Sequence, residues 1–240
     1  MKPNNLKIKI FADCADKAGM LEMYKNPWIK GFTTNPTLMR KAGIKNYKEF
    51  AHDILQHIPD RSISFEVFAD EFNEMAHQAK EIASWGKNVM VKIPVTNTKG
   101  QFAGDLIKKL SHDGIPLNVT AVLPFSQVQK IAECLSSHTP AIISVFAGRI
   151  ADTGVDPIPL MKQAVELLKN RPNIELLWAS PRELLNVIQA NDIGCHIITA
   201  TNDILKKLEL LGKDLEEFSL ETVKMFYQDA TSAGYKIESN

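Results

Sequence analysis

The sequence predicts an α/β fold, and more narrowly a (β/α)8 barrel with additional C-terminal helices. Short runs rich in β-branched residues recur along the 240 residues, and longer stretches with apolar residues at helical spacing separate them. Eight such runs in this length favour a closed parallel barrel over an open doubly wound sheet, which usually has fewer strands. The expected strands cover residues 7–13, 30–34, 62–68, 88–94, 115–121, 141–146, 174–179 and 195–200.

The segments between these strands are typical of amphipathic helices. Apolar side chains recur every three or four residues from Phe72 to Trp85, and the segment from Ile158 to Leu168 behaves in the same way. No Gly-, Ser- or Pro-rich linker interrupts the alternation, so we expect a single domain over residues 1–240. The tail, about 202–240, predicts two or three helices, including one from Leu220 to Ala233. Its apolar face either covers the barrel or docks on a neighbouring subunit, and the sequence leaves both alternatives open.

The composition bears on the partners and the location of the protein. The 28 basic residues balance the 28 acidic ones, whereas nucleic-acid and membrane surfaces need an excess of Lys and Arg, so we expect neither partner. The amino terminus has no apolar run of signal-peptide length, and no segment approaches the ~20 apolar residues of a membrane span. We therefore expect a cytoplasmic protein. The three cysteines and six histidines show no metal-binding spacing, which predicts reduced thiols and no metal site.

Polar side chains stand late in several expected strands, where a barrel of this kind carries its active site. Alternate residues of a barrel strand face the packed interior, where polar groups are poor choices for a core. Taken singly each signal is weak, because Asn or Thr at a strand end often satisfies loop backbone groups. The candidates are Asp13 at the end of the first strand, Thr33 and Asn35 at the end of the second, Glu66 in the third, Lys92 in the fourth, Asn118 and Thr120 in the fifth, and Ser180 after the seventh.

Lys92 is the most informative of these residues, because Val91 and Ile93 flank it. An apolar environment favours the neutral amine of a lysine, which is the form that attacks a carbonyl carbon. A carboxylate and a hydroxyl would carry the protons, and strand position places Glu66 and Thr120 at the same mouth of the barrel. The alternative for a lone lysine is a surface side chain that extends along apolar neighbours into water. The conjunction of the three residues predicts imine chemistry at Lys92.

Five short segments extend this interpretation over most of the chain: Thr33-Thr-Asn-Pro-Thr-Leu38, Val91-Lys-Ile-Pro-Val-Thr96, Ile115-Pro-Leu-Asn-Val-Thr-Ala121, Ser144-Val-Phe-Ala-Gly-Arg-Ile150 and Trp178-Ala-Ser-Pro-Arg182. In order and spacing they resemble the transaldolase family, particularly its short members, which include the fructose-6-phosphate aldolases. The resemblance implies a TIM barrel that acts on sugar phosphates in carbohydrate metabolism such as the pentose phosphate pathway. It also implies class I aldol chemistry through a lysine Schiff base, with no metal and no organic cofactor.

The resemblance assigns a role to each matching position. Lys92 would form the imine with the ketose donor, and Asp13 would take and return the proton of the hydroxyl beside the bond that breaks. Glu66 would act through a water held by Thr120. Arginine suits the sugar phosphate because its planar group grips phosphate oxygens and stays charged. The residues implied to bind substrate are Asn35 and Asn118 for the dihydroxyacetone portion, Thr33 and Ser180 in support, and Arg149 and Arg182 for the phosphate.

Two positions bear on the choice between transfer and cleavage. The resemblance suggests that the dedicated aldolases carry Gln where this chain has Glu66, and Tyr where it has Phe146. Both positions here are similar to those of transaldolases, so we expect transfer of a dihydroxyacetone unit from one ketose phosphate to an aldose phosphate. The alternatives are an aldolase that releases free dihydroxyacetone, and a barrel that binds sugar phosphates without catalysis.

Other positions depart from the family pattern. Pro181 stands where the resemblance leads us to expect a phenylalanine, and it fixes the backbone beside Arg182, so the identity of the sugars stays open. The short members also imply a ring-based homo-oligomer such as a decamer, with the tail around Phe226 crossing to a neighbour.

Overall fold

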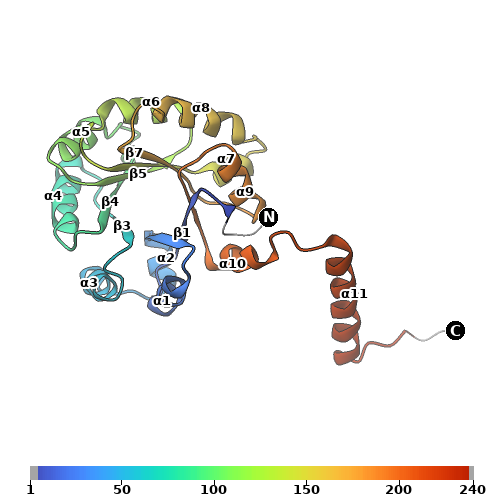
Figure 1. Ribbon diagram of the computed structural model, residues 1–240. Helices are drawn as coiled ribbons and strands as arrows, with labels where there is room; N and C mark the ends of the chain where they lie inside the picture. Colours follow the sequence, from blue (N-terminus) through green and yellow to red (C-terminus); the bar gives the residue numbers. More distant parts are fainter. Residues whose placement is uncertain (1–4, 238–240) are drawn as a thin grey trace.

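Eight parallel strands close into a barrel in the order β1 to β8 in the computed structural model, which describes residues 5–237. Strand β1 pairs with both β2 and β8, which closes the sheet on itself, and helices surround it (Figure 1). The predicted fold class is therefore confirmed. The strands are β1 (Lys9–Asp13), β2 (Ile29–Thr33), β3 (Ser62–Glu66), β4 (Val89–Pro94), β5 (Leu117–Val122), β6 (Ala141–Val145), β7 (Ile174–Trp178) and β8 (Ile197–Ala200).

The helices lie where the apolar spacing places them. Helix α8 has the predicted bounds, whereas α11 begins five residues before the predicted Leu220, because the Asp214 side chain accepts from the backbone N–H groups of Glu216 and Glu217 and caps an earlier start. The helices are α1 (Lys17–Lys25), α2 (Pro36–Lys41), α3 (Tyr47–His57), α4 (Phe72–Ala83), α5 (Gly104–His112), α6 (Phe125–Cys134), α7 (Ala147–Asp152), α8 (Ile158–Leu168), α9 (Leu185–Asp192), α10 (Asn202–Leu205), the 3-10 helix η2 (Lys206–Leu210) and α11 (Leu215–Ser232).

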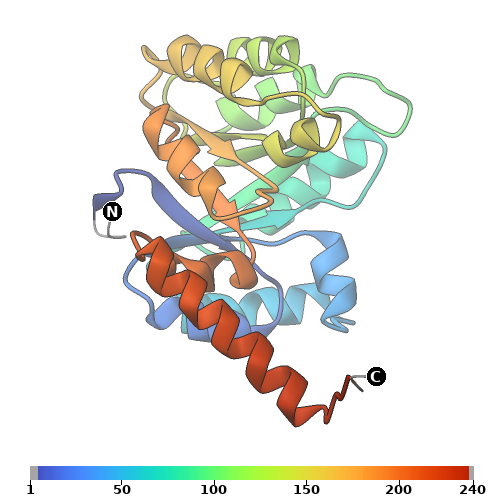
Figure 2. The same ribbon diagram turned by 90° about the vertical axis from the view of Figure 1, so that its right-hand side faces the viewer.

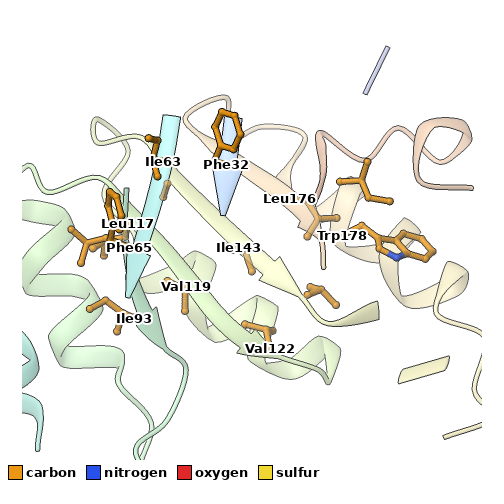
Figure 3. Packing of buried hydrophobic residues seen from close by; sticks show 14 of the residues in the cluster. Phe32, Ile63, Phe65, Ile93, Leu117, Val119, Val122, Ile143, Leu176 and Trp178 are labelled. Carbon is orange, nitrogen blue, oxygen red and sulfur yellow. The ribbon is translucent and has the colours of Figure 1, made fainter. Parts of the chain in front are cut away.

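The outward faces of the strands form the larger part of the hydrophobic core. Phe32, Phe65, Ile93 and Trp178 point from the sheet toward the surrounding helices and are almost completely buried (Figure 3). Burying a side chain of this size contributes roughly 1.5–3 kcal/mol relative to leaving it exposed. This layer fixes the strands, so that the opposite faces of the same strands can carry other chemistry.

The inward faces form a second, smaller cluster inside the barrel. Phe11, Ile142, Leu177 and Ile197 are buried there, and none of them lines the cavity at the barrel mouth. A Cβ atom at Gly31 would lie 2.5 Å from the Phe11 ring, so the glycine makes room for this aromatic plug. The barrel interior therefore contains a small packed core of its own.

The tail after β8 runs away from the barrel, as Figure 1 shows for α11, and Figure 2 shows α11 from that side as one long helix. The short helices α10 and η2 still contact the core through Ile204, Leu205 and Leu208, whereas no residue of α11 is buried. The two or three predicted tail helices are present. Within residues 5–237, no helix has the length and apolar character needed to cross a bilayer.

Candidate active site

A cavity of about 430 Å³ opens at the carboxyl ends of the strands. Side chains from β1 to β8 and from the loops that follow them line it, because inward-facing residues at the ends of parallel strands converge on one mouth. Nine of the eleven site residues predicted from the sequence lie in its wall: Asp13, Thr33, Asn35, Glu66, Lys92, Thr120, Phe146, Arg149 and Ser180. The other two, Asn118 and Arg182, lie beside it.

Lys92 lies deep in this cavity with only 6% of its surface exposed. Its amine lies 3.1 Å from Glu66 Oε2 and donates to the backbone carbonyl of Thr34 at 2.7 Å. Lys92 and Glu66 face each other because they are register partners on β4 and β3. The carboxylate predicted to handle protons at Lys92 is therefore within direct reach of the amine.

Asp13 ends β1 on the same side of the barrel. Its carboxylate accepts from Thr33 Oγ1 at 2.8 Å and from Asn35 Nδ2 at 3.5 Å. Burial raises the pKa of Asp13 above its ordinary value, and the nearby Lys92 and the hydrogen bond from Thr33 oppose that shift only in part. A carboxyl whose pKa is raised toward neutrality can both take and return a proton under ordinary conditions.

Asn118 lies below the cavity and is completely buried. Its amide nitrogen donates to Ser64 Oγ at 3.0 Å, and its amide oxygen accepts from Ser144 Oγ at 2.7 Å. Both amide groups are thus held by neighbouring strands, and Asn118 is the register partner of Lys92 on β5. The arrangement fixes the orientation of the amide directly beside the lysine.

Arg149 and Phe146 close one side of the mouth at the start of α7. The guanidinium of Arg149 lies 5.5 Å from the centre of the Phe146 ring, close enough for a cation–π interaction. Both side chains line the cavity. The mouth therefore presents a fixed positive charge beside an apolar ring.

Arg182 lies outside this wall and borders an adjacent cavity of about 330 Å³, which shares Asp13, Ser180 and Thr199 with the first. Its Nε and Nη2 donate to the two carboxylate oxygens of Asp152, with Nε 2.8 Å from Oδ1. The hydrogen bond from Arg182 lowers the pKa of Asp152 below its ordinary value. The structure thus places Arg182 near the mouth but already engaged by an acidic partner.

Ser180, between these two cavities, has an unusual backbone. Its φ of 56° lies in the left-handed region, which residues other than glycine adopt rarely. Its carbonyl would lie 1.5 Å from a Cβ atom built on Gly148, and Gly148 donates its N–H to Ala179 at 3.3 Å. The glycine of the Phe-Ala-Gly-Arg segment is therefore required by the close approach of the loop after β7.

Several residues of the site were not predicted. Ser144 and Thr199 line the cavity, and Thr199 lies 2.6 Å from the hydroxyl of Thr33. Both sit on inward-facing strand positions, so strict alternation along β6 and β8 could have found them. Tyr47 on α3 and the carbonyl of Thr34 also reach the site residues, and no local pattern marks them.

A closed (β/α)8 barrel with buried ionisable side chains in a cavity at its carboxyl mouth is the architecture of a TIM-barrel enzyme. The family model for transaldolase/fructose-6-phosphate aldolase matches residues 10–238. The chain is 35% identical over 202 residues to a probable transaldolase of Dehalococcoides mccartyi, covering 84% of this chain and 90% of the relative. It is 32% identical over 231 residues to a probable transaldolase of Thermoanaerobacter sp., covering 96% of this chain and all of the relative. The chain belongs to the transaldolase/fructose-6-phosphate aldolase family.

Solved structures that resemble the chain are more distant and show the fold alone. A putative lyase/mutase from Burkholderia cenocepacia superimposes with a TM-score of 0.58 at 10% identity, over 96% of this chain and 85% of the other. A 3-hexulose-6-phosphate synthase gives a TM-score of 0.55 at 11% identity, over 82% and 90%. These likenesses agree with the barrel topology.

Proposed function

We propose that the protein is a transaldolase that moves a dihydroxyacetone unit between sugar phosphates through a Schiff base on Lys92. The observation that carries this proposal is the buried Lys92 amine, 3.1 Å from a carboxylate, in a cavity at the barrel mouth. Family membership supports the substrate class, since the matching family comprises transaldolases and fructose-6-phosphate aldolases. The donors are fructose 6-phosphate or sedoheptulose 7-phosphate, and the acceptor is an aldose phosphate.

The first half of the reaction forms a covalent intermediate. The Lys92 amine adds to the ketose carbonyl, and loss of water gives the imine. Glu66, acting through a water held by Thr120, transfers the protons of this step. The bond between the third and fourth sugar carbons then breaks as Asp13 takes the proton of the adjacent hydroxyl. An aldose phosphate leaves, and a three-carbon enamine stays on Lys92.

The second half reverses these steps with a new acceptor. The enamine carbon adds to the carbonyl of the second aldose phosphate, and Asp13 returns its proton to the new hydroxyl. Hydrolysis of the imine then frees the product and restores the Lys92 amine. The raised pKa of Asp13 supports this two-way role, because a carboxyl of ordinary pKa would return the proton poorly near neutral pH.

Substrate contacts follow from the positions around Lys92. Asn35 and Asn118 hold the hydroxyls of the dihydroxyacetone portion, with Thr33 and Ser180 in support. Arg149, which lines the cavity mouth, binds the phosphate. Arg182 joins it in our proposal, and in doing so exchanges part of its contact with Asp152 for phosphate oxygens.

Transfer is favoured over cleavage by the residue at position 146. Phe146 lines the cavity and carries no hydroxyl that could protonate the carbanionic intermediate and release dihydroxyacetone. Glu66 likewise supplies a carboxylate where the aldolases are expected to have an amide. Cleavage by an aldolase is the second candidate. A non-catalytic sugar-phosphate-binding barrel is less supported, because binding alone does not need a buried amine beside a carboxylate.

Borohydride reduction in the presence of fructose 6-phosphate, followed by peptide mass mapping, tests the mechanism. We expect one stable adduct on the peptide that contains Lys92. No adduct, or an adduct on another lysine, would contradict the imine. A coupled assay then separates the two activities, because product formation that depends on erythrose 4-phosphate indicates transfer, and formation from fructose 6-phosphate alone indicates cleavage.

We also propose that the protein acts as a homo-oligomer joined through α11. The support is that this 18-residue helix buries no residue against its own barrel, while Val223, Phe226 and Tyr227 are 60%, 63% and 74% exposed. Burial of these side chains on a neighbouring chain would remove an apolar surface from water. Analytical ultracentrifugation of a chain truncated after Leu220 is expected to show fewer chains per particle than in the intact protein. An unchanged number of chains per particle would contradict the proposal.

A further inference from the structure

The hydrogen-bond ladder between β2 and β3 is interrupted beside Lys92. Thr34 donates its N–H to the carbonyl of Ser64 at 3.2 Å. In a regular parallel pair, the carbonyl of Thr34 would then accept from the N–H of Glu66, two residues farther along β3. Here that carbonyl accepts from the Lys92 amine at 2.7 Å instead. The first carbonyl after β2 thus holds the lysine and does not take part in the sheet.

The second ladder partner of Glu66 is missing as well. The next donor along β2 would be residue 36, and Pro36, which begins α2, has no N–H. The N–H and the C=O of Glu66 therefore both lack their regular partners on the β2 side. Unsatisfied buried backbone groups are costly, so another group must replace them if this end of β3 is to keep its position.

The hydroxyl of Tyr47 replaces both partners. It accepts from the N–H of Glu66 at 2.7 Å and donates to the carbonyl of the same residue at 3.1 Å. A phenolic hydroxyl can do this because it carries one hydrogen and free lone pairs. One side-chain atom thus takes the place of a stretch of β-strand.

Tyr47 is itself held firmly at the start of α3. The Asn46 side chain caps this helix by accepting from the N–H of Glu49. The Tyr47 ring lies between three aromatic rings, with centroid distances of 4.5 Å to Phe68, 5.4 Å to Trp85 and 6.0 Å to Phe65. Burial raises the pKa of Tyr47 well above its ordinary value, which keeps the hydroxyl protonated and able to donate.

We propose that Tyr47 is a positioning residue for Glu66, and that by satisfying the Glu66 backbone it leaves the Thr34 carbonyl free to hold Lys92. This inference rests on the proposed roles of Glu66 and Lys92 in proton transfer and imine formation. Tyr47 does not line the cavity, and it acts only through these two neighbours.

Tyr47→Phe tests the inference because it removes the hydroxyl and keeps the ring. The N–H of Glu66 then turns to its regular partner, the Thr34 carbonyl, and competes with Lys92 for it. We expect kcat for transfer to fall by about tenfold while KM stays within about twofold, since no substrate-binding side chain is altered. Reductive trapping on Lys92 should slow by a similar factor.

Two comparisons show whether the effect passes through Glu66. Tyr24→Phe is the matched control, because it removes a phenol hydroxyl that binds the exposed Asp60 on the outside of the barrel, and kcat should not change. In a Glu66→Gln background, Tyr47→Phe should lower kcat by a smaller factor than in the native background, because the contribution of the Glu66 carboxylate is already lost while the backbone N–H of residue 66 still competes for the Thr34 carbonyl. An unchanged kcat in the single variant, or the same fold-loss in both backgrounds, overturns the proposal.

A measurement on the unaltered protein covers the case in which Tyr47→Phe does not fold. The Glu66 amide should exchange with deuterium at least about 100-fold more slowly than in an unstructured peptide, and rapid exchange overturns the proposal. The trapping of the native enzyme separates the two ideas. Failure of the native protein to trap fructose 6-phosphate on Lys92 refutes the proposed function, whereas normal trapping with an unaffected Tyr47→Phe variant refutes only the role of Tyr47.

Discussion

The two ends of the barrel interior each carry a lysine–glutamate pair, in opposite surroundings. At the amino end, Lys9 and Glu175 lie 2.8 Å apart with 52% and 31% of their side chains exposed. At the carboxyl end, Lys92 and Glu66 lie 3.1 Å apart with 7% and 17% exposed. Water screens the first pair, which at such sites contributes about 0–1 kcal/mol.

The buried pair cannot be explained by stability in the same way. Removing two charges from water is costly, and a buried pair is often no more stable than apolar residues of the same volume. The pair at the carboxyl end therefore agrees with the proposed chemistry, whereas the pair at the amino end is partly exposed to solvent. Substitutions at the two ends should separate these effects.

The largest difference is expected between the two lysines. Lys92→Met removes the proposed nucleophile, and transfer should fall by about a thousandfold or more. Lys9→Met is the matched control at the other end of the barrel and should leave the rate within about twofold. Both are measured with the coupled assay, after circular dichroism has shown that each variant is folded. A Lys92→Met variant with more than a tenth of the native rate would contradict the proposal that Lys92 is the nucleophile.

The apolar plug should show the reverse pattern. Phe11→Ala empties the space above Gly31 inside the barrel and should lower the free energy of unfolding by about 3–5 kcal/mol. The folded fraction should keep its kcat, since Phe11 does not line the candidate active site. Urea unfolding measures the first quantity. A loss of stability below about 1 kcal/mol would mean that the cluster around Phe11 is not tightly packed, although its side chains are buried.

Asp13→Asn links activity and stability through pH. Loss of the base should lower kcat by about a hundredfold. Because the pKa of Asp13 is raised on folding, the folded state holds the proton more tightly, and this contribution to stability is full below the unfolded pKa of about 3.9 and is lost as pH rises through the folded pKa. The asparagine side chain cannot ionise. The melting temperature of the variant minus that of the native protein should therefore increase as pH rises from about 4 to about 8. A difference that is constant across this range would show that burial does not perturb Asp13.

The smallest expected effect concerns the reaction outcome. The double variant Glu66→Gln with Phe146→Tyr should raise the ratio of cleavage to transfer by about tenfold, because the new hydroxyl can protonate the intermediate. Phe218→Tyr, which adds a hydroxyl on exposed α11, is the control. Dihydroxyacetone release and transfer to erythrose 4-phosphate are measured in parallel. An unchanged ratio would place the discriminating residues elsewhere in the cavity.

The sequence predicted the eight strands and most of the site because one rule governs both. Inward-facing residues at strand ends meet at one mouth, and this rule predicts that Asp13, Glu66 and Lys92 lie together, as they do in the cavity wall. The rule does not cover Tyr47, which reaches the site from a helix, nor the Thr34 carbonyl, since a backbone group has no signature in sequence. Contacts that form only when distant segments pack together cannot be predicted from strand or helix periodicity.

The contact of Arg182 could not be predicted from the sequence either. Its position was predicted, but its contact with Asp152 depends on how the loop after β7 approaches α7, 30 residues earlier in the chain. That approach depends on Gly148 and on the left-handed Ser180, and neither feature follows from strand or helix periodicity.

The contact between Gly148 and Ser180 also couples two loops mechanically. Arg149 follows the glycine and Arg182 lies two residues after the serine, so the two cationic side chains share one backbone junction. A movement of one loop is therefore expected to shift the other, and Arg149 and Arg182 with it. In the proposed function, a phosphate that binds these two arginines does not have to order two independent loops, and more of its binding energy is left for discriminating between sugars.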